Sequence, residues 1–443
     1  MGLVFLILFA LAEITLVVLT FTKFGEKVKW LNNRLIVRGA EAALLLGMVL
    51  LPTTYLKWRF FGALIVLVIR FLFAGIMWLI RRKKAQGMKK KAGTVVNCIV
   101  SLLLVGFMLV PSFIFANYNG LPTTGEFKVK ETSAILVDEG RLDEFENDGS
   151  FREVPAHFYY PDAEGGSYPL VMFSHGAFGY YQSNFSTYAE LASNGYVVVA
   201  LDHPHHAFFT KDTDGKTVTV DQEFINSAMN IGGGDDEQVY EVTSSWMKLR
   251  VDDGNFVLDT IKEAKDSGSL GSAWHTEDAT NVQSVIAMTD TGKIGYMGHS
   301  LGGATGVALG RVRKDISAVI DLDGTALGEI VGIRDGKCVC IDEPYPVPVL
   351  VLSQEMNGDE EGAYANVTEN MIDLAKDGKL ATFHGAGHMD FTDLPLFSPV
   401  LGSMFGHGDV NSEEFLTNVN GIVLNWFNYY LKNEGTVTVQ AQY

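Results

Sequence analysis

The stretch KIGYMGHSLGGATG, residues 293–306, places a serine between glycines directly after an apolar run. Gly298, Ser300 and Gly302 fit the pattern G-x-S-x-G, and the segment that follows has the composition of a helix. A strand-to-helix turn of this kind is sterically tight, so only small neighbours fit, and it lifts the serine above the carboxyl edge of a sheet. We predict that Ser300 is a nucleophile. The alternative is a glycine turn whose serine only caps the helix.

The residues around this turn alternate between short apolar runs and amphipathic stretches. Apolar strands that are each followed by a helix predict a parallel sheet covered on both faces. The predicted strands are VPAHFYYP (154–161), YPLVMFSHG (168–176), YVVVALDHP (196–204), KIGYMGHS (293–300), SAVIDLDG (317–324), VPVLVLSQE (347–355) and LATFHGAGH (380–388). The predicted helices are 184–194, 236–266, 301–313, 365–376 and 412–432. We therefore predict one mostly parallel α/β domain over residues 118–443.

A nucleophilic serine needs a general base, and the base needs a group that orients it. The base is expected after the last strand, where HGAGHMDFTDLP offers two histidines. His384 falls within the apolar strand and is expected to pack there, whereas His388 lies in the glycine-flanked turn that follows. We predict that His388 is the base, with His407 in FGHGDVN as a distant third candidate.

Two places in the chain can supply the orienting carboxylate. Asp323 stands at the end of the strand after the nucleophile helix, and Glu355 or Asp359 stands in the turn after VPVLVLSQE. Asp321 is a poorer candidate, because side chains alternate between the two faces of a strand. Geometry alone leaves the two places open.

An oxyanion formed by attack on a carbonyl needs backbone N–H donors. One is the amide of Leu301, at the start of the helix after the serine. The second should come from the loop after the first central strand, VMFSHGAFGYY, where the backbone turns at Gly176. In that loop the donor would be the amide of Ala177 or Phe178.

Together these positions resemble the type II platelet-activating factor acetylhydrolase family within the α/β-hydrolases. The resemblance covers roughly residues 125–432 and rests on FSHGAFG, YAELASNGYVVVALDHPHHAF, GHSLGGAT, LDG, GHMDFTD and VLGSMFGHGDVNSEE. It implies that the acid is Asp323 and that the oxyanion amides are Ala177 and Leu301. It further implies a Ser300–His388–Asp323 triad that cleaves short-acyl or lipid carboxylic esters with no cofactor. A broader likeness to dienelactone hydrolases and cutinases would take the acid from the later turn.

Two other functions are compatible with the same motifs. An amidase or peptidase would use the same triad, because the serine turn does not distinguish an ester from an amide. A membrane-bound sensor could keep the hydrolase fold without activity, since a fold does not fix a function.

The first 117 residues differ from the rest of the chain. They contain 15 Lys and Arg against 3 Asp and Glu, a net charge of +12, whereas the remainder has 19 against 49, a net charge of −30. Because a hydrocarbon core of about 30 Å takes about 20 helical residues to cross, we predict four transmembrane helices. The apolar runs are 2–22, 35–55, 60–80 and 95–116.

Charged residues inside these runs are expected to pair with one another. Arg38 and Glu41 interrupt the second run and are spaced to meet across one helical turn. Arg70 lies within the third run and is expected to pair with Glu13 or Glu41.

The loops between the runs predict an orientation. Basic residues gather between the first and second runs and again in RRKKAQGMKKK, residues 81–91. Because basic loops stay in the cytoplasm, four crossings would put the N-terminus and everything after Ala116 outside, as a multi-pass protein of the cell membrane.

Composition also bears on partners. The acidic surface of residues 118–443 argues against nucleic acid, whose phosphates it would repel. Cys338 and Cys340 are one residue apart and lack a second Cys or His pair, and the histidines of DHPHH (202–206) form no repeated metal-ligand spacing. We predict no metal and no cofactor, and the membrane and a small or lipid ester as partners.

Overall fold

The computed structural model describes residues 1–355 and 362–443, and it divides into two compact units. The first, here called the helical unit, is Met1–Gly120 with Pro395–Met404. The second, here called the α/β unit, is Leu121–Leu394 with Phe405–Tyr443. The sequence analysis placed the division between residues 117 and 118.

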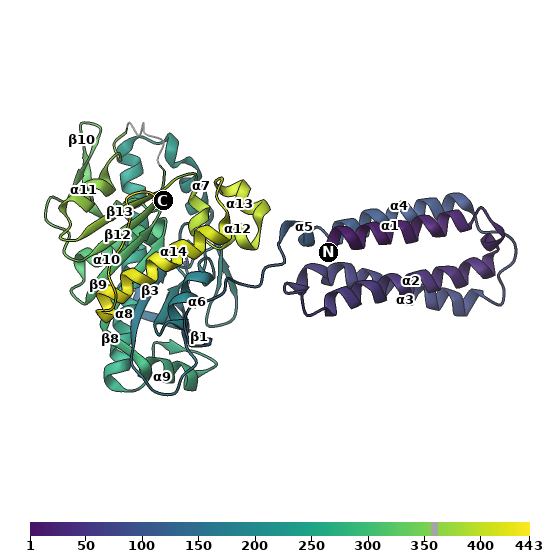
Figure 1. Ribbon diagram of the computed structural model, residues 1–443, viewed down its shortest axis with the longest axis horizontal. Coiled ribbons are helices and arrows are strands. Elements are labelled where there is room, and N and C mark those ends of the chain that lie inside the picture. Colours follow the sequence, from purple (N-terminus) through teal and green to yellow (C-terminus); the bar gives the residue numbers. More distant parts are fainter. Residues whose placement is uncertain (356–361) are drawn as a thin grey trace. The chain divides into compact units, whose positions relative to one another are not determined.

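The helical unit consists of four long helices and a short one that lie side by side (Figure 1). Their bounds are α1 (Gly2–Leu19), α2 (Lys27–Leu50), α3 (Phe61–Arg81), α4 (Lys91–Met108) and α5 (Pro111–Ile114). The segment Pro395–Met404 contains most of α12 (Leu394–Phe397) and of α13 (Pro399–Phe405).

Two of the four predicted runs need correction. The second run, predicted at 35–55, is part of a helix that begins eight residues earlier, at Lys27, and ends at Leu50. The fourth, predicted at 95–116, ends at Met108, and Pro111 starts the separate helix α5, since proline cannot donate to the preceding turn.

By length and composition, three helices in the described residues could cross a membrane: Gly2–Leu19, Lys57–Arg81 and Lys91–Met108. The sequence predicted four membrane-spanning helices. The difference is α2, whose mean hydropathy is lowered by charged residues, among them Arg38 and Glu41.

The two mid-helix charges of α2, Arg38 and Glu41, face inward and are paired. Arg38 and Glu41 are 1% and 3% exposed, and Arg38 Nη1 donates to Glu41 Oε2 at 2.8 Å. Arg38 also donates to Glu13 of α1 at 3.0 Å, and Arg70 of α3 contacts the same carboxylate and Ser101 Oγ at 2.6 Å. The pairings predicted from spacing are therefore present, and they join α1, α2, α3 and α4.

The α/β unit is built on a nine-stranded sheet. In spatial order its strands are β13 (Gly378–Phe383), β12 (Val349–Gln354), β9 (Ile316–Leu322), β8 (Thr289–His299), β3 (Tyr168–Ser174), β4 (Val197–Leu201), β2 (Phe151–Pro161), β1 (Val129–Leu142) and β7 (Trp274–His275). The first six are parallel to one another, and β2, β1 and β7 add antiparallel pairs. The sheet is thus mixed and mostly parallel, as the sequence predicted.

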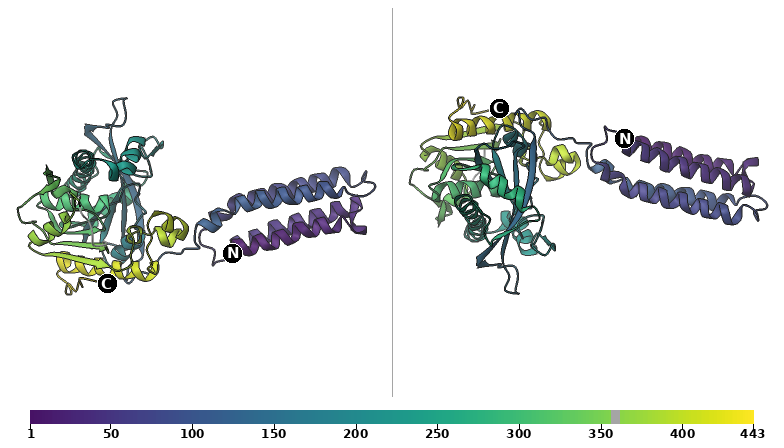
Figure 2. Two further views of the ribbon diagram at one scale, coloured as in Figure 1. Left: turned by 90° about the horizontal axis from the view of Figure 1, so that it is seen from above. Right: turned by 90° about the horizontal axis from the view of Figure 1, so that it is seen from below.

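Helices cover both faces of this sheet (Figures 1 and 2). On one face α6 (Phe185–Ser193) packs against α14 (Ser412–Phe427), and on the other α8 (Asp236–Ser267) packs against α10 (Leu301–Val312). Further helices are α7 (Gln222–Asn230), α9 (Ala279–Met288) and α11 (Val367–Leu374). Two hairpins, β5 (Phe209–Lys211) with β6 (Thr217–Thr219) and β10 (Ile330–Arg334) with β11 (Lys337–Cys340), lie outside the main sheet.

All seven predicted strands are in the sheet, but β1 and β7 were not predicted. β1 lies between β2 and the two-residue β7, and only two of its residues, Ala134 and Leu136, are buried. A strand buried on so little of its length carries no continuous apolar run, which is why composition did not reveal it.

Candidate active site

Ser300 lies at the junction of β8 and α10, in a backbone conformation that L-residues rarely adopt. Its φ and ψ are 55° and −126°. A Cβ on Gly298 would come within 2.2 Å of Gly302 O, and a Cβ on Gly302 within 2.0 Å of Ser174 O. Glycine is therefore required at both positions, and the packed surroundings hold the serine in a conformation that costs about 1–3 kcal/mol.

His388 and Asp323 are joined by a direct hydrogen bond. His388 begins the turn His388–Phe391 after β13, and its Nδ1 donates to Asp323 Oδ2 at 2.6 Å. Asp323 follows β9, and its other oxygen accepts from the Gln354 N–H of β12 at 2.7 Å. Both carboxylate oxygens are thus occupied, which fixes the orientation of the imidazole.

This pair lies beside the residue that precedes the serine. The rings of His388 and His299 are 4.6 Å apart, and His299 Nε2 donates to the backbone oxygen of His388 at 3.0 Å. Burial, and then the neighbouring His388, lower the pKa of His299 well below its usual value, so its ring is neutral. Among the described residues, Ser300 Oγ has no hydrogen-bond partner, and Ser300 is partly exposed.

The other histidines considered as bases have different partners. His384 is 84% exposed and forms an ion pair with Glu355, so the expectation that it packs in the strand is wrong: β13 ends at Phe383. His407 contacts Asp390, whose Oδ2 accepts from the Gly387 N–H at 2.8 Å. This carboxylate therefore holds the turn that carries His388.

Of the alternative acids, Glu355 is occupied by His384, and Asp359 lies outside the described residues. Asp321 is fully buried, and one of its oxygens accepts from the Gly324 N–H at 2.9 Å. Burial raises the pKa of Asp321 well above its usual value. It does not reach the imidazole, as strand alternation predicted.

The loop after β3 lies against the serine. A Cβ on Gly176 would come within 3.1 Å of Ser300 Cβ. The Phe178 N–H donates to His206 O at 3.1 Å, so it is already engaged. Within the part of the chain that the structure describes, the N–H groups of Ala177 and Leu301 donate to no protein group.

A second array of polar side chains, beneath this loop, was not predicted. His203 Nδ1 donates to Asp253 at 3.0 Å, and its Nε2 accepts from the Ser174 hydroxyl at 3.0 Å. Ser174 accepts in turn from Tyr296 OH at 2.8 Å, and Arg152 donates to Asp253 at 2.8 Å. All five side chains are buried. Sequence spacing could not reveal this array, because its members come from five separate elements.

The three histidines of DHPHH each contact a different residue. His203 pairs with Asp253, His205 stacks on Phe145, and His206 accepts from Arg250. Across residues 1–355 and 362–443, no group of three or more His, Cys, Asp or Glu side chains is placed to hold a metal.

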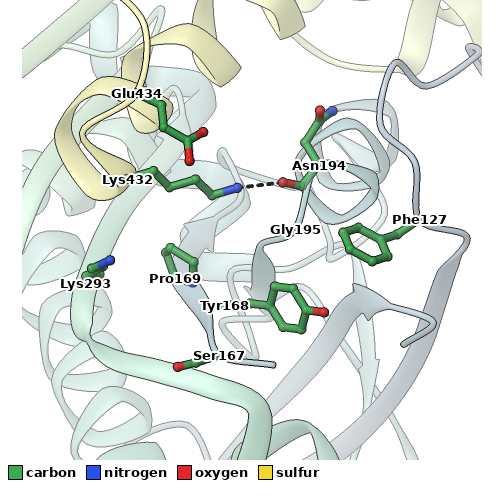
Figure 3. Close-up of a pocket in the computed structure, with 9 residues that line it drawn as sticks. All are labelled: Phe127, Ser167, Tyr168, Pro169, Asn194, Gly195, Lys293, Lys432 and Glu434. Carbon is green, nitrogen blue, oxygen red and sulfur yellow. Dashed lines mark hydrogen bonds between the residues drawn. The ribbon is translucent and has the colours of Figure 1, made fainter. Parts of the chain in front are cut away.

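A cavity of about 310 Å³, whose lining residues are drawn in Figure 3, lies at the amino ends of β3 and β4. It is lined at the amino ends of β3 and β4 by Tyr168, Pro169 and Gly195, and Lys432 Nζ donates there to Asn194 O at 2.6 Å. Because Ser300 follows the carboxyl end of β8, this cavity is separate from the serine.

With this geometry in place, comparison with known proteins is informative. Residues 151–436 match the family described as platelet-activating factor acetylhydrolase, isoform II. The chain belongs to this family. The match includes Ser300, Asp323 and His388 and begins beyond the helices α1–α5.

Two relatives and one solved structure illustrate the similarity. The platelet-activating factor acetylhydrolase of Canis lupus familiaris is 24% identical over 268 residues, which is 58% of this chain and 56% of that protein. A probable 1-alkyl-2-acetylglycerophosphocholine esterase of Arthroderma benhamiae is 30% identical over 178 residues, 39% of this chain and 36% of that one. A ferulic acid esterase from Streptomyces cinnamoneus aligns with a TM-score of 0.54 and 20% identity, over 71% of this chain and 93% of that one. The chain thus matches less than two thirds of the length of either curated relative, and the structural match supports the fold alone.

Proposed function

We propose that this protein is a serine hydrolase that cleaves carboxylic esters, with Ser300 as nucleophile, His388 as general base and Asp323 as the group that orients the base. The observation that carries the proposal is the 2.6 Å hydrogen bond from His388 Nδ1 to Asp323, beside a serine held at φ 55°. Family membership supports the same reaction class, because the relatives are named as acetylhydrolases and esterases.

In the proposed reaction, Ser300 Oγ attacks the ester carbonyl and His388 Nε2 takes the hydroxyl proton. The N–H groups of Ala177 and Leu301 bind the oxyanion of the tetrahedral intermediate. The C–O bond to the alcohol then breaks, and His388 returns the proton to the leaving oxygen. Water, activated by His388, hydrolyses the acyl-enzyme. Because catalytic hydrogen bonds tighten in the substrate complex, the serine and histidine need not be bonded beforehand.

The substrates we propose are short-acyl or lipid esters. The names of the relatives refer to acetylated ether phospholipids, and the helical unit would keep the serine near a bilayer. No residue of the proposed site requires a cofactor.

We further propose that all four long helices cross the membrane and that the α/β unit lies outside the cell. α2 is 24 residues long, and its mid-helix charges are paired internally, which removes most of the cost of placing them in lipid. The basic loops 23–34 and 81–91 would remain in the cytoplasm.

The orientation can be tested with reporter fusions. Alkaline phosphatase, which folds only outside the cytoplasm, should be active when fused after Tyr443 and inactive when fused after Arg82. The reverse result would contradict the orientation while leaving the proposed chemistry untouched.

The chemistry is tested on the full chain in detergent with p-nitrophenyl acetate. Ser300→Ala and His388→Ala should each lower kcat by about 10⁴-fold or more, and a fluorophosphonate should label Ser300. His384→Ala is the matched control, because that histidine is exposed and should leave the rate unchanged. Equal rates for the wild type and Ser300→Ala would overturn the proposal, and a strong preference for anilides over esters would make the protein an amidase.

A further inference from the structure

Arg250 of α8 is a fully buried arginine with an unusual set of partners. It is 0% exposed, and no carboxylate among the described residues lies within ion-pair distance of its guanidinium. The buried Arg152 pairs with Asp253, and the less deeply buried Arg311 pairs with Glu329. Because a buried charge is normally paired, an arginine without a direct ion pair calls for another explanation.

The donors of Arg250 reach backbone oxygens of the loop after β3. Its Nη1 donates to His175 O at 2.5 Å, its Nη2 to Gly176 O at 3.4 Å, and its Nε to His206 Nδ1 at 3.3 Å. Two of these acceptors are backbone oxygens and carry no charge. Burial, and then the charge of Arg250, lower the pKa of His206, so the third acceptor is a neutral imidazole. Arg250 therefore binds the loop itself and not a counter-ion.

These contacts decide which way the neighbouring amides point. In a planar trans peptide the carbonyl and the following N–H point in opposite directions. Gly176 O is turned toward Arg250 and also accepts from His175 Nδ1 at 2.6 Å, so the Ala177 N–H points away from the guanidinium. The next amide, of Phe178, is bonded to His206 O. The Ala177 N–H therefore points away from Arg250 and donates to no group among the described residues.

The same loop is in contact with the nucleophile's turn. The distance of 3.1 Å between a Cβ built on Gly176 and Ser300 Cβ leaves no room for a side chain between them. Ala177, whose N–H points away from Arg250, directly follows the glycine that approaches Ser300.

We propose that Arg250 is a positioning residue that holds the carbonyls of His175 and Gly176 so that the Ala177 N–H faces the oxyanion on the Ser300 adduct. The inference rests on the proposed ester hydrolysis. A donor on Gly176 O also polarises the peptide and makes Ala177 a better donor. Burial lowers the pKa of Arg250 to about 9, with the charge of Asp253 opposing, so the guanidinium remains protonated at neutral pH and its charge favours the oxyanion.

The test compares an oxoester with its thionoester in full-length variants. Sulfur is large and accepts hydrogen bonds poorly, so the thionoester gains little from the oxyanion donors. Arg250→Lys keeps the charge but cannot bind both carbonyls. We expect it to lower kcat for p-nitrophenyl acetate by about 10²-fold, with the thionoester about tenfold less affected and KM within about twofold.

Arg311→Lys is the matched control, because Arg311 also donates to two backbone oxygens, of Glu343 and Pro344, at 3.1 and 3.0 Å. It should leave the ratio of the two rates unchanged. Equal losses on both substrates for Arg250→Lys, or the same change in ratio for Arg311→Lys, would overturn the inference. Arg250→Met should lower the ratio of the oxoester rate to the thionoester rate further. If this variant does not fold, the result for Arg250→Lys decides the test. A wild type without Ser300-dependent activity would instead refute the proposed function.

Discussion

Two of the histidine–aspartate pairs in the described part of the α/β unit lie near a serine, and these two differ in almost every other respect. Ser174, His203 and Asp253 form a complete hydrogen-bonded chain, and His203 is 0% exposed. His388, bonded to Asp323, is 37% exposed, and the serine nearby stands at a strained turn. Connectivity alone would select the buried set as the catalytic one.

The burial of Ser174, His203 and Asp253 argues against a catalytic role for them. Burial lowers the pKa of His203 to about 4, with Arg250 acting in the same direction and Asp253 opposing. Its Nε2 already accepts a hydrogen bond from a serine that no substrate can reach. The comparison teaches that a nucleophile is recognised by access and backbone strain, while a saturated polar chain of the same residue types supports the loop above it.

The largest expected effect is a loss of kcat when Asp323 is replaced, which distinguishes it from Asp253. Asp323→Asn should lower kcat by about 10⁴-fold, because the amide favours the wrong imidazole tautomer, with little change in stability. Steady-state hydrolysis of p-nitrophenyl acetate measures it. Glu355→Gln is the control and should change kcat by less than about twofold. A large loss for Glu355→Gln and none for Asp323→Asn would move the acid to the later turn.

Asp253→Asn should affect stability instead. Breaking this buried pair should cost about 3–5 kcal/mol in unfolding free energy, and kcat of the folded protein should fall far less than in Asp323→Asn. Calorimetry of the full chain in detergent measures the change. Loss of activity without loss of stability would mean that the buried chain takes part in catalysis.

Asp253 should also make the stability of the fold depend on pH. Burial alone would raise the pKa of Asp253, but the charge of Arg152 and the hydrogen bond from His203 outweigh it and hold the pKa below its usual value. A lowered carboxyl pKa stabilises the fold above the unfolded value of about 4, and the stabilisation is lost as pH falls below it. Asp253→Asn should therefore flatten the acid limb of the stability profile, and an unchanged limb would contradict this.

A smaller effect is expected in the helical unit, where the buried charges of Glu13, Arg38 and Glu41 are paired with one another. Glu13→Gln leaves Arg38 and Arg70 without their shared carboxylate and should cost about 3 kcal/mol. Titration of the full chain with dodecyl sulfate in micelles measures it. Glu26→Gln, at an exposed pair with Lys29, should cost less than about 0.5 kcal/mol. Equal losses of stability for Glu13→Gln and Glu26→Gln would show that the internal charges do not hold the helices together.

The smallest expected effect is that of Ser174→Ala. It removes a hydroxyl shared by His203 and Tyr296 and should destabilise the fold by about 1–2 kcal/mol. Fluorophosphonate labelling at Ser300 should persist in this variant. Labelling of Ser174 in the native wild type would contradict its burial.

The sequence identified the features that depend on local pattern. Strand-length apolar runs predicted the parallel part of the sheet, and G-x-S-x-G placed Ser300 at a strand-to-helix turn. The spacing of Arg38 and Glu41 predicted their contact. The strand β1 and the exposure of His384 were missed, because both depend on where the sheet ends.

Residues alone determined the fold class and pointed to Ser300 and His388 as the proposed nucleophile and base, since period, glycine spacing and turn position are local properties of the chain. Which carboxylate meets His388, and what supports the loop beside Ser300, was decided only by tertiary structure. Asp323 reaches the imidazole across 65 positions of sequence and Arg250 reaches His175 across 75, and such contacts exist only once the strands are in register.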